Sequence, residues 1–96
     1  MSRLSLLLLG LSFAVAAAPA RLLVSPDGND GADGVNAPFA TLARARDAAR
    51  TLRQAGQLPE GAEIVVAAGV YDLPEPVVFG PEDAGTLDAP LLVRAA

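Results

Sequence analysis

The chain has 96 residues, a formal net charge of −4 and neither histidine nor cysteine. The absence of cysteine excludes a disulfide framework, a thiolate metal site and a lipidated N-terminal cysteine. The acidic balance argues against nucleic acid as a partner, because phosphate binding requires a basic surface. All seven basic residues are arginines, so the chain also lacks the groups for a histidine-dependent triad, a cysteine nucleophile or a lysine base.

Residues 1–20 have the pattern of a signal peptide. Arg3 precedes an apolar run over residues 4–18, and Ala18-Pro19-Ala20 has small residues at the spacing that a signal peptidase recognises. The run of about 15 residues is shorter than the roughly 20 that a membrane span needs, so an uncleaved anchor is the weaker alternative. We expect an exported protein, periplasmic, extracellular or on the cell surface, whose mature part covers residues 21–96.

This mature part is polar, because the leader inflates the hydrophobic fraction of 52%. Without Arg3, six arginines oppose eleven acidic residues, which gives a charge of −5 (6 − 11). A chain of this size folds alone only marginally. Residues 91–94 form a predicted strand without a closing element, and complete proteins usually cover such an edge. We therefore expect a piece of a longer protein.

The mature sequence begins with a short apolar strand over residues 22–24, followed by an acidic loop over residues 27–34. Seven of these eight loop residues favour turns. The spacing fails the calcium-loop pattern, since a register from Asp27 places Ala32 at the glycine position and Pro38 at the distal glutamate position. A register from Asn29 fails too. A plain turn is favoured over an irregular calcium site.

A helix is predicted from Leu42, with Thr41 as N-cap, Gly56 at its C-terminal end and Pro59 preventing continuation. Small apolar residues share one face, which suggests a lid lying close to a flat apolar surface. The stripe consists of Leu42, Ala45, Ala48, Ala49 and Leu52.

The other side of the helix carries Arg44, Arg46, Arg50 and Arg53, here called the arginine cluster. A solvated face with ion pairs to Asp47 is favoured over an anion-binding face for uronate or sulfate groups.

Three further strands are predicted after the helix, at residues 64–68, 77–79 and 91–93. The first is continuously apolar, as expected for a strand covered on both sides. Their starts lie 13 and 14 residues apart (64, 77 and 91), too close for a crossover helix. The connections are therefore predicted to be hairpins or the bends of a solenoid coil.

Few residues are candidates for chemistry. Glu82 and Asp83 are adjacent carboxylates, but Pro81 and Gly85 favour a structural turn over a hydrolytic pair. Tyr71 is interpreted as a residue that packs a corner rather than as a sugar platform. Arg94 has no neighbour in sequence that would activate it. We therefore expect no catalytic, cofactor-binding or metal-binding residue in this chain, and no cofactor.

Five segments in order resemble the N-terminal cap of secreted right-handed parallel β-helix (pectin-lyase-like) proteins. Ala84 departs from that pattern, because many relatives have serine there. The resemblance implies a mainly β fold with one capping helix, namely the N-terminal cap and about the first coil of a β-helix, as an incomplete fragment. The segments are residues 24–30, 38–42, 45–50, 69–71 and 82–90.

The same resemblance implies that the complete protein is a polysaccharide lyase or glycoside hydrolase, which would meet polysaccharide through later coils. The remaining coils of the same protein would be the partner of this segment. A non-catalytic β-helix surface or carbohydrate-binding protein is the alternative, and a small autonomous secreted domain of helices and strands is a third hypothesis.

Overall fold

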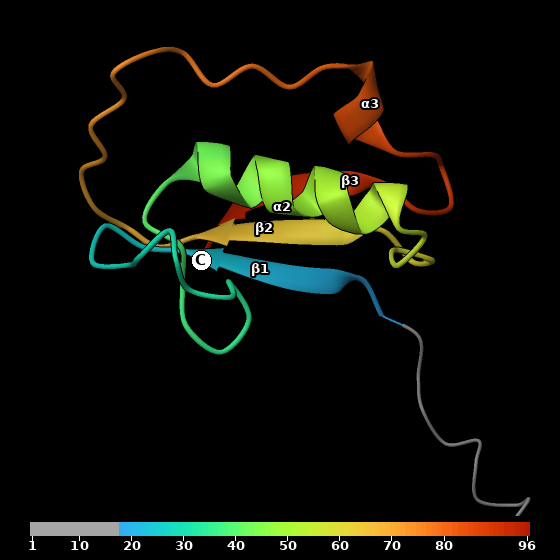
Figure 1. Ribbon diagram of the computed structural model, residues 1–96, viewed down its shortest axis with the longest axis horizontal. Coiled ribbons are helices and arrows are strands. Elements are labelled where there is room, and N and C mark those ends of the chain that lie inside the picture. The colour runs from blue at the N-terminus through green and yellow to red at the C-terminus, as the bar shows by residue number, and fades with distance from the viewer. Residues whose placement is uncertain (1–17) are drawn as a thin grey trace, which may run out of the picture.

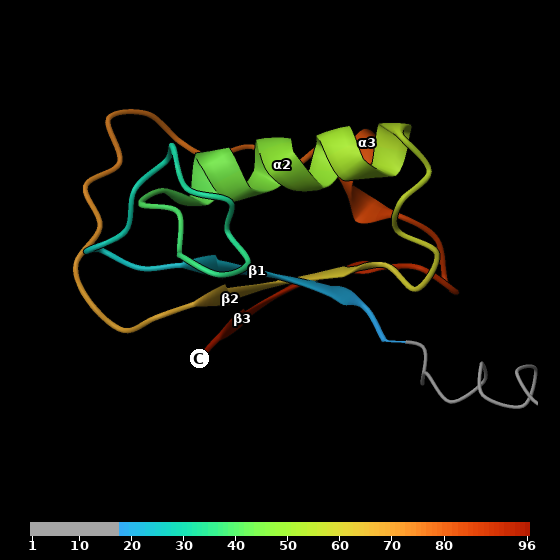
Figure 2. The same ribbon diagram turned by 60° about the horizontal axis from the view of Figure 1, so that its bottom comes forward.

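The computed structural model describes residues 18–96, which form a sheet layer and a helix layer (Figures 1 and 2). The predicted signal sequence lies mostly outside these residues. The elements are β1 (Ala20–Val24), α2 (Leu42–Gln54), β2 (Ala62–Val66), α3 (Pro81–Ala84) and β3 (Leu91–Ala95). The three strands form one sheet in the order β1-β2-β3, and both pairings are parallel.

The connection from β1 to β2 is a crossover through α2, and α2 lies over one face of the sheet (Figure 2). Ala62 at the start of β2 is in register with Ala20 on one side and with Leu91 on the other. Parallel strands require such long connections, because a tight turn joins only antiparallel neighbours.

The core lies between α2 and the sheet. Leu22, Ile64 and Phe39 are at most 2% exposed and belong to one cluster with Ala45 and Ala49 of the helix. Burial of each large apolar side chain stabilises the fold by about 1.5–3 kcal/mol. The predicted apolar stripe is confirmed. Ala45 and Ala49 are buried, and the other members of the stripe pack against the cluster, namely Leu42, Ala48 and Leu52.

The two edges of the sheet differ. The loop after β1 borders its outer edge, where Leu23 exchanges hydrogen bonds with Gly34 and Phe39. Beyond β3, the described residues provide no further strand, and Leu92 and Val93 remain 51% and 46% exposed. β2, which has a neighbour on each side, is buried at Ala62, Ile64 and Val65. An inner position in the sheet therefore accounts for the continuous apolar run of β2.

The predicted fold class is wrong. The described residues form a small compact domain with one three-stranded parallel sheet and two helices, and they show no solenoid coil. A coil would need strands on several sides of an apolar bore, whereas all three strands here share one sheet. The helix does not plug the end of a cylinder, because α2 lies over the face of that sheet. The third hypothesis, a small domain of helices and strands, describes this architecture better.

The expected strand at residues 77–79 is also absent from the structure. This segment is irregular and arches away from the sheet before α3 (Figure 1). Val78 is 65% exposed, and its carbonyl accepts a hydrogen bond from Arg46 Nη1 at 2.9 Å. β2 therefore pairs with β3 and not with the apolar segment nearest in sequence. The other three predicted strands and the helix are confirmed.

Candidate functional site

Asp30 of the acidic loop binds the beginning of α2. Its Oδ1 accepts hydrogen bonds from the backbone N–H groups of Ala40 and Thr41 at 2.9 Å, and its Oδ2 accepts one from Thr41 Oγ1 at 2.8 Å. Thr41 Oγ1 in turn accepts from Arg44 N, which confirms the predicted N-cap. A carboxylate at this end also interacts favourably with the helix dipole. The first turn of α2 has no acidic residue of its own. Asp30, which lies eleven residues before Thr41, supplies the negative charge at this end of the helix.

Asp33 stabilises the second half of the loop. Its carboxylate accepts backbone hydrogen bonds from Val35, Asn36 and Ala37, and these bonds lower its pKa to about 2. Asn29 accepts a similar bond from Gly31 N at 2.7 Å. The turn predicted for residues 27–34 is therefore confirmed, and the side chains of Asn29 and Asp33 accept hydrogen bonds from nearby backbone N–H groups.

The arginine cluster binds the segment that returns over the helix. Arg50 donates two parallel hydrogen bonds to Asp83, at 2.9 and 2.8 Å, and Gly80 N donates a third. The Arg50 guanidinium, followed by the Gly80 N–H, lowers the pKa of Asp83 against the opposing effect of burial. The hydrogen bond to Asp83 in turn raises the pKa of Arg50. Only 1% of the Asp83 side chain is exposed, so this ion pair is an internal contact between α2 and α3.

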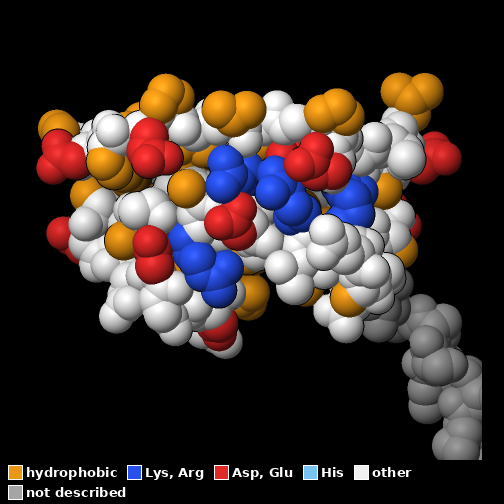
Figure 3. Space-filling view, turned by 45° about the horizontal axis from the view of Figure 1, so that its top comes forward, with side chains coloured by type: hydrophobic (Ala, Val, Ile, Leu, Met, Phe, Trp, Pro, Cys, Tyr) orange, Lys and Arg blue, Asp and Glu red, His pale blue; other side chains and the backbone are white. Residues whose placement is uncertain are grey.

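The other three arginines also have internal partners, and Figure 3 shows acidic side chains beside the basic ones on this face of the molecule. Arg46 contacts Asp47 and the Val78 carbonyl, and Arg53 Nη1 donates to the Ala89 carbonyl at 3.2 Å. Arg44 Nε donates to the Asp30 carbonyl, and its guanidinium lies 4.7 Å from the centre of the Phe39 ring. The favoured interpretation as a solvated face is thus incomplete, because the cluster fixes the loop before α2 and the segment around α3.

The acidic pair at Glu82 and Asp83 occupies the first turn of α3. Asp83 is buried, whereas the Glu82 side chain is 55% exposed and contacts Arg50 at 3.3 Å. Both carboxylates therefore meet the same guanidinium, which supports the predicted structural role. The geometry differs from a hydrolytic pair, whose carboxyl groups face each other across a sugar.

The face of the sheet opposite α2 carries a second ionic group. Glu63 accepts from Arg94 at 3.2 Å and lies 3.3 Å from Arg21, so it links the two outer strands across β2. The hydrogen bond from Arg94, followed by the charges of both arginines, lowers the pKa of Glu63 despite partial burial. Arg94 is therefore engaged in a contact within the sheet.

A pocket opens where β1 and β2 end and α2 begins, and we call it the strand-end pocket. It has a volume of about 300 Å³. Val24, Val66 and Leu42 belong to its apolar lining, while Tyr71 and Asp72 come from the segment that follows β2. In sheets with helix crossovers, ligands commonly bind at the carboxyl ends of the strands. The volume of this pocket and its mainly apolar lining suit a small ligand.

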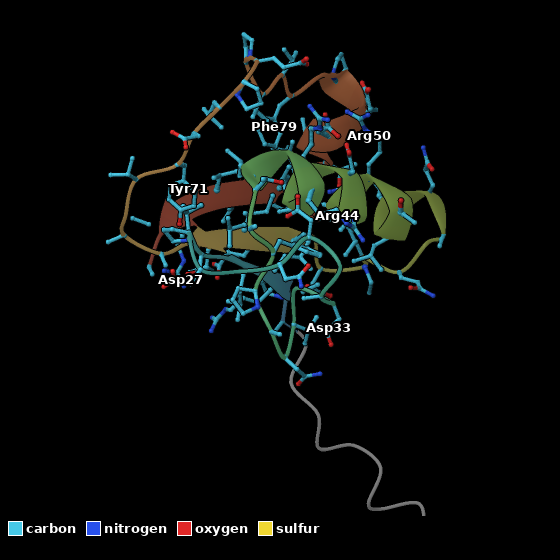
Figure 4. All side chains as sticks on the ribbon, turned by 60° about the vertical axis from the view of Figure 1, so that its left-hand side comes forward. Asp27, Asp33, Arg44, Arg50, Tyr71 and Phe79 are labelled. Carbon is cyan, nitrogen blue, oxygen red and sulfur yellow. The ribbon has the colours of Figure 1, made fainter. Side chains whose placement is uncertain are left out.

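Tyr71 helps to build this pocket. Its hydroxyl donates a 2.6 Å hydrogen bond to the Ala67 carbonyl, and its ring packs against the core cluster (Figure 4). The packing role predicted for Tyr71 is therefore confirmed, and the residue also lines the pocket. Asp72 is exposed beside it. Nothing in the spacing of residues 70–73 predicted a pocket, because the crossover through α2 brings Leu42 to this place.

Comparison with known proteins gives one informative match. A solved structure described as a glycoside hydrolase aligns with this chain at 39% identity and a TM-score of 0.74. The alignment covers 79% of this chain but 13% of the other chain. No family profile matches the sequence, and no curated protein matches it.

This likeness supports a fold related to one part of a glycoside hydrolase, and with it a link to polysaccharides. It does not identify the expected cap. No helix within residues 18–96 has the length and apolarity that a bilayer crossing requires.

Proposed function

We propose that this chain is a structural module of a larger exported glycoside hydrolase, with the catalytic carboxylates on other parts of that protein. The observation that carries the proposal is the 39% identity to a glycoside hydrolase of which the chain matches only 13%. A lyase or a non-catalytic surface protein has no comparable support.

The internal use of the carboxylates supports a structural role. A glycosidase needs two carboxyl groups about 5–10 Å apart, and its general acid needs a raised pKa. Within residues 18–96, hydrogen-bond donors lower the pKa of the carboxyl groups of Asp33, Glu63 and Asp83. Such groups stay ionised at neutral pH and accept hydrogen bonds, and this suits a role in stabilising the domain.

Hydrolysis assays test this proposal. The longest open reading frame that contains the chain would be expressed beside the 96-residue chain, and release of reducing ends from neutral polysaccharides would be measured for both. We expect release by the longer product and none by the chain. Release by the chain itself, lost on replacement of Glu82 by glutamine, would contradict the structural role. A reading frame without further sequence, or an inactive longer product, would contradict the hydrolase assignment.

Export is part of the proposal. Arg3, the apolar residues 4–18 and the Ala18-Pro19-Ala20 site support it, although β1 already begins at Ala20, one residue before the predicted mature start. Fusing residues 1–25 to a reporter that is active only after translocation should give activity. A second fusion with Leu7→Arg and Leu8→Arg should be inactive. Equal activity of the two fusions would refute a signal peptide.

A further inference from the structure

We propose that the strand-end pocket binds one neutral sugar ring of a polysaccharide. The proposal rests on the polysaccharide link of the proposed function and adds a location and a substrate class. Its starting point is the shape and polarity of the pocket, which is mostly apolar and has a carboxylate at its rim. Pockets for small ligands generally combine an apolar lining with a few polar groups that fix orientation.

The apolar lining fits the face of a pyranose ring that carries C–H groups. Val24 is 1% exposed, whereas Val70 and Leu73, at 87% and 55%, have apolar surface that remains open to a ligand. The hydrogen bond from Tyr71 to Ala67 fixes the aromatic side chain without a ligand, so little side-chain freedom would be lost on binding. The pocket is therefore largely formed before a sugar enters.

Asp72 supplies the polar recognition. It is exposed among the lining residues, and a carboxylate accepts hydrogen bonds from the hydroxyl groups of a sugar. Thr41 is less available, because its hydroxyl already donates to Asp30 and accepts from Arg44 N. The lining thus joins an apolar surface to the carboxylate of the exposed Asp72, which matches the two sides of a sugar ring.

The charge of the site selects a neutral sugar over an acidic one. No arginine lines the strand-end pocket, and each of the six arginines of the described residues contacts a carboxylate or a backbone carbonyl elsewhere. A uronate would bring its own carboxylate close to Asp72 without a compensating cation, which is unfavourable. The alternative of uronate binding on the arginine cluster loses its basis, because these arginines already contact a carboxylate or a backbone carbonyl.

Titration followed by amide NMR of the chain tests the proposal. The probes are xylotetraose and cellotetraose as neutral oligosaccharides and tetragalacturonate as the acidic one. We expect saturable shifts with at least one neutral probe, confined to residues 41–42 and 66–73, and none with tetragalacturonate at equal concentration. Asp72→Ala should weaken binding about five- to tenfold through loss of a charged hydrogen bond. Leu73→Ser should weaken it as well, and Asp88→Ala, another exposed carboxylate, should not.

Since Asp72, Leu73 and Asp88 are exposed, the variants should keep the dispersed spectrum of the parent chain. The absence of shifts with both neutral probes, equal binding of the acidic probe, or unchanged affinity after Asp72→Ala would overturn the proposal. If the titration of the chain shows no binding while the longer protein hydrolyses polysaccharide, only the proposed sugar site is refuted. If the chain binds a neutral probe saturably while the longer protein is inactive, only the hydrolase assignment is refuted.

Discussion

Replacing Asp83 by asparagine tests the contact between α2 and α3. The change keeps the shape of the side chain but removes the charge that accepts two hydrogen bonds from Arg50 and one from Gly80. Hydrogen bonds to charged groups contribute about 1.5–3 kcal/mol each. The Arg50 side chain is 29% exposed and still contacts Glu82, so water and Glu82 recover part of the loss. We expect Asp83→Asn to lower the free energy of unfolding by about 2–3 kcal/mol.

For a domain of this size, that loss corresponds to a fall in Tm of roughly 10–20 °C, measurable by circular dichroism. Glu82→Gln is the matched control, because it removes a 55% exposed partner of the same arginine and should change stability by less than about 0.5 kcal/mol. Asp83→Asn and Glu82→Gln variants of equal stability would refute the assignment of Asp83 as the principal link.

The pH dependence of the Asp83 contribution has a defined sign. The folded state lowers the pKa of Asp83, so its stabilisation is complete above the unfolded pKa of about 3.9 and is lost as the pH falls through the folded pKa. The stability difference between the parent chain and Asp83→Asn should therefore be largest near pH 6 and should shrink below about pH 4. A difference that grows in acid would contradict this reasoning.

Two further predictions concern the loop after β1. Asp33 should titrate with a pKa of about 2 in carboxyl NMR, and Asp33→Asn should flatten the loss of stability between about pH 4 and pH 2; a pKa near 3.9 would contradict the role of its three backbone hydrogen bonds. Gly28→Ala should cost more than about 2 kcal/mol in urea unfolding, since its Cβ would lie 2.2 Å from the Phe39 carbonyl oxygen. Gly31→Ala, whose nearest neighbour is a side-chain atom of Asn29 at 3.2 Å, should cost less, and equal losses would refute the steric argument.

Local features of the sequence predicted the local features of the fold. The period of the alanines placed the buried face of α2, and Thr41 marked its first turn, because both signals act within a few residues. The apolar runs likewise located the three strands that form. They also gave a false strand at residues 77–79, because composition does not reveal that the Val78 carbonyl meets Arg46 instead of a strand.

Arrangement in space was harder to predict, because it depends on pairs distant in sequence. Asp83 and Arg50 lie 33 residues apart, and nothing in either neighbourhood specifies the other. The assignment of the arginines to a solvated face was incomplete for that reason. The spacing of a strand expected at residues 77–79 argued against a crossover helix after residue 64, whereas β2 and β3 pair in parallel through one long connection that contains α3. The strand-end pocket could not be found from the sequence, since it exists only once β1, β2 and α2 meet.

The all-parallel sheet has a consequence for folding kinetics. Ala20 pairs with Ala62 across 42 residues (62 − 20), and Ala62 pairs with Leu91 across 29 residues (91 − 62), so no ladder can start from a hairpin. Closing such loops costs entropy before any strand contact is gained, and chains rich in distant contacts fold slowly. We expect the docking of α2 to belong to the rate-limiting step of folding, because it brings β1 and β2 together. Substitutions that weaken Thr41 or the Asp30 contacts should then slow folding more than they speed unfolding.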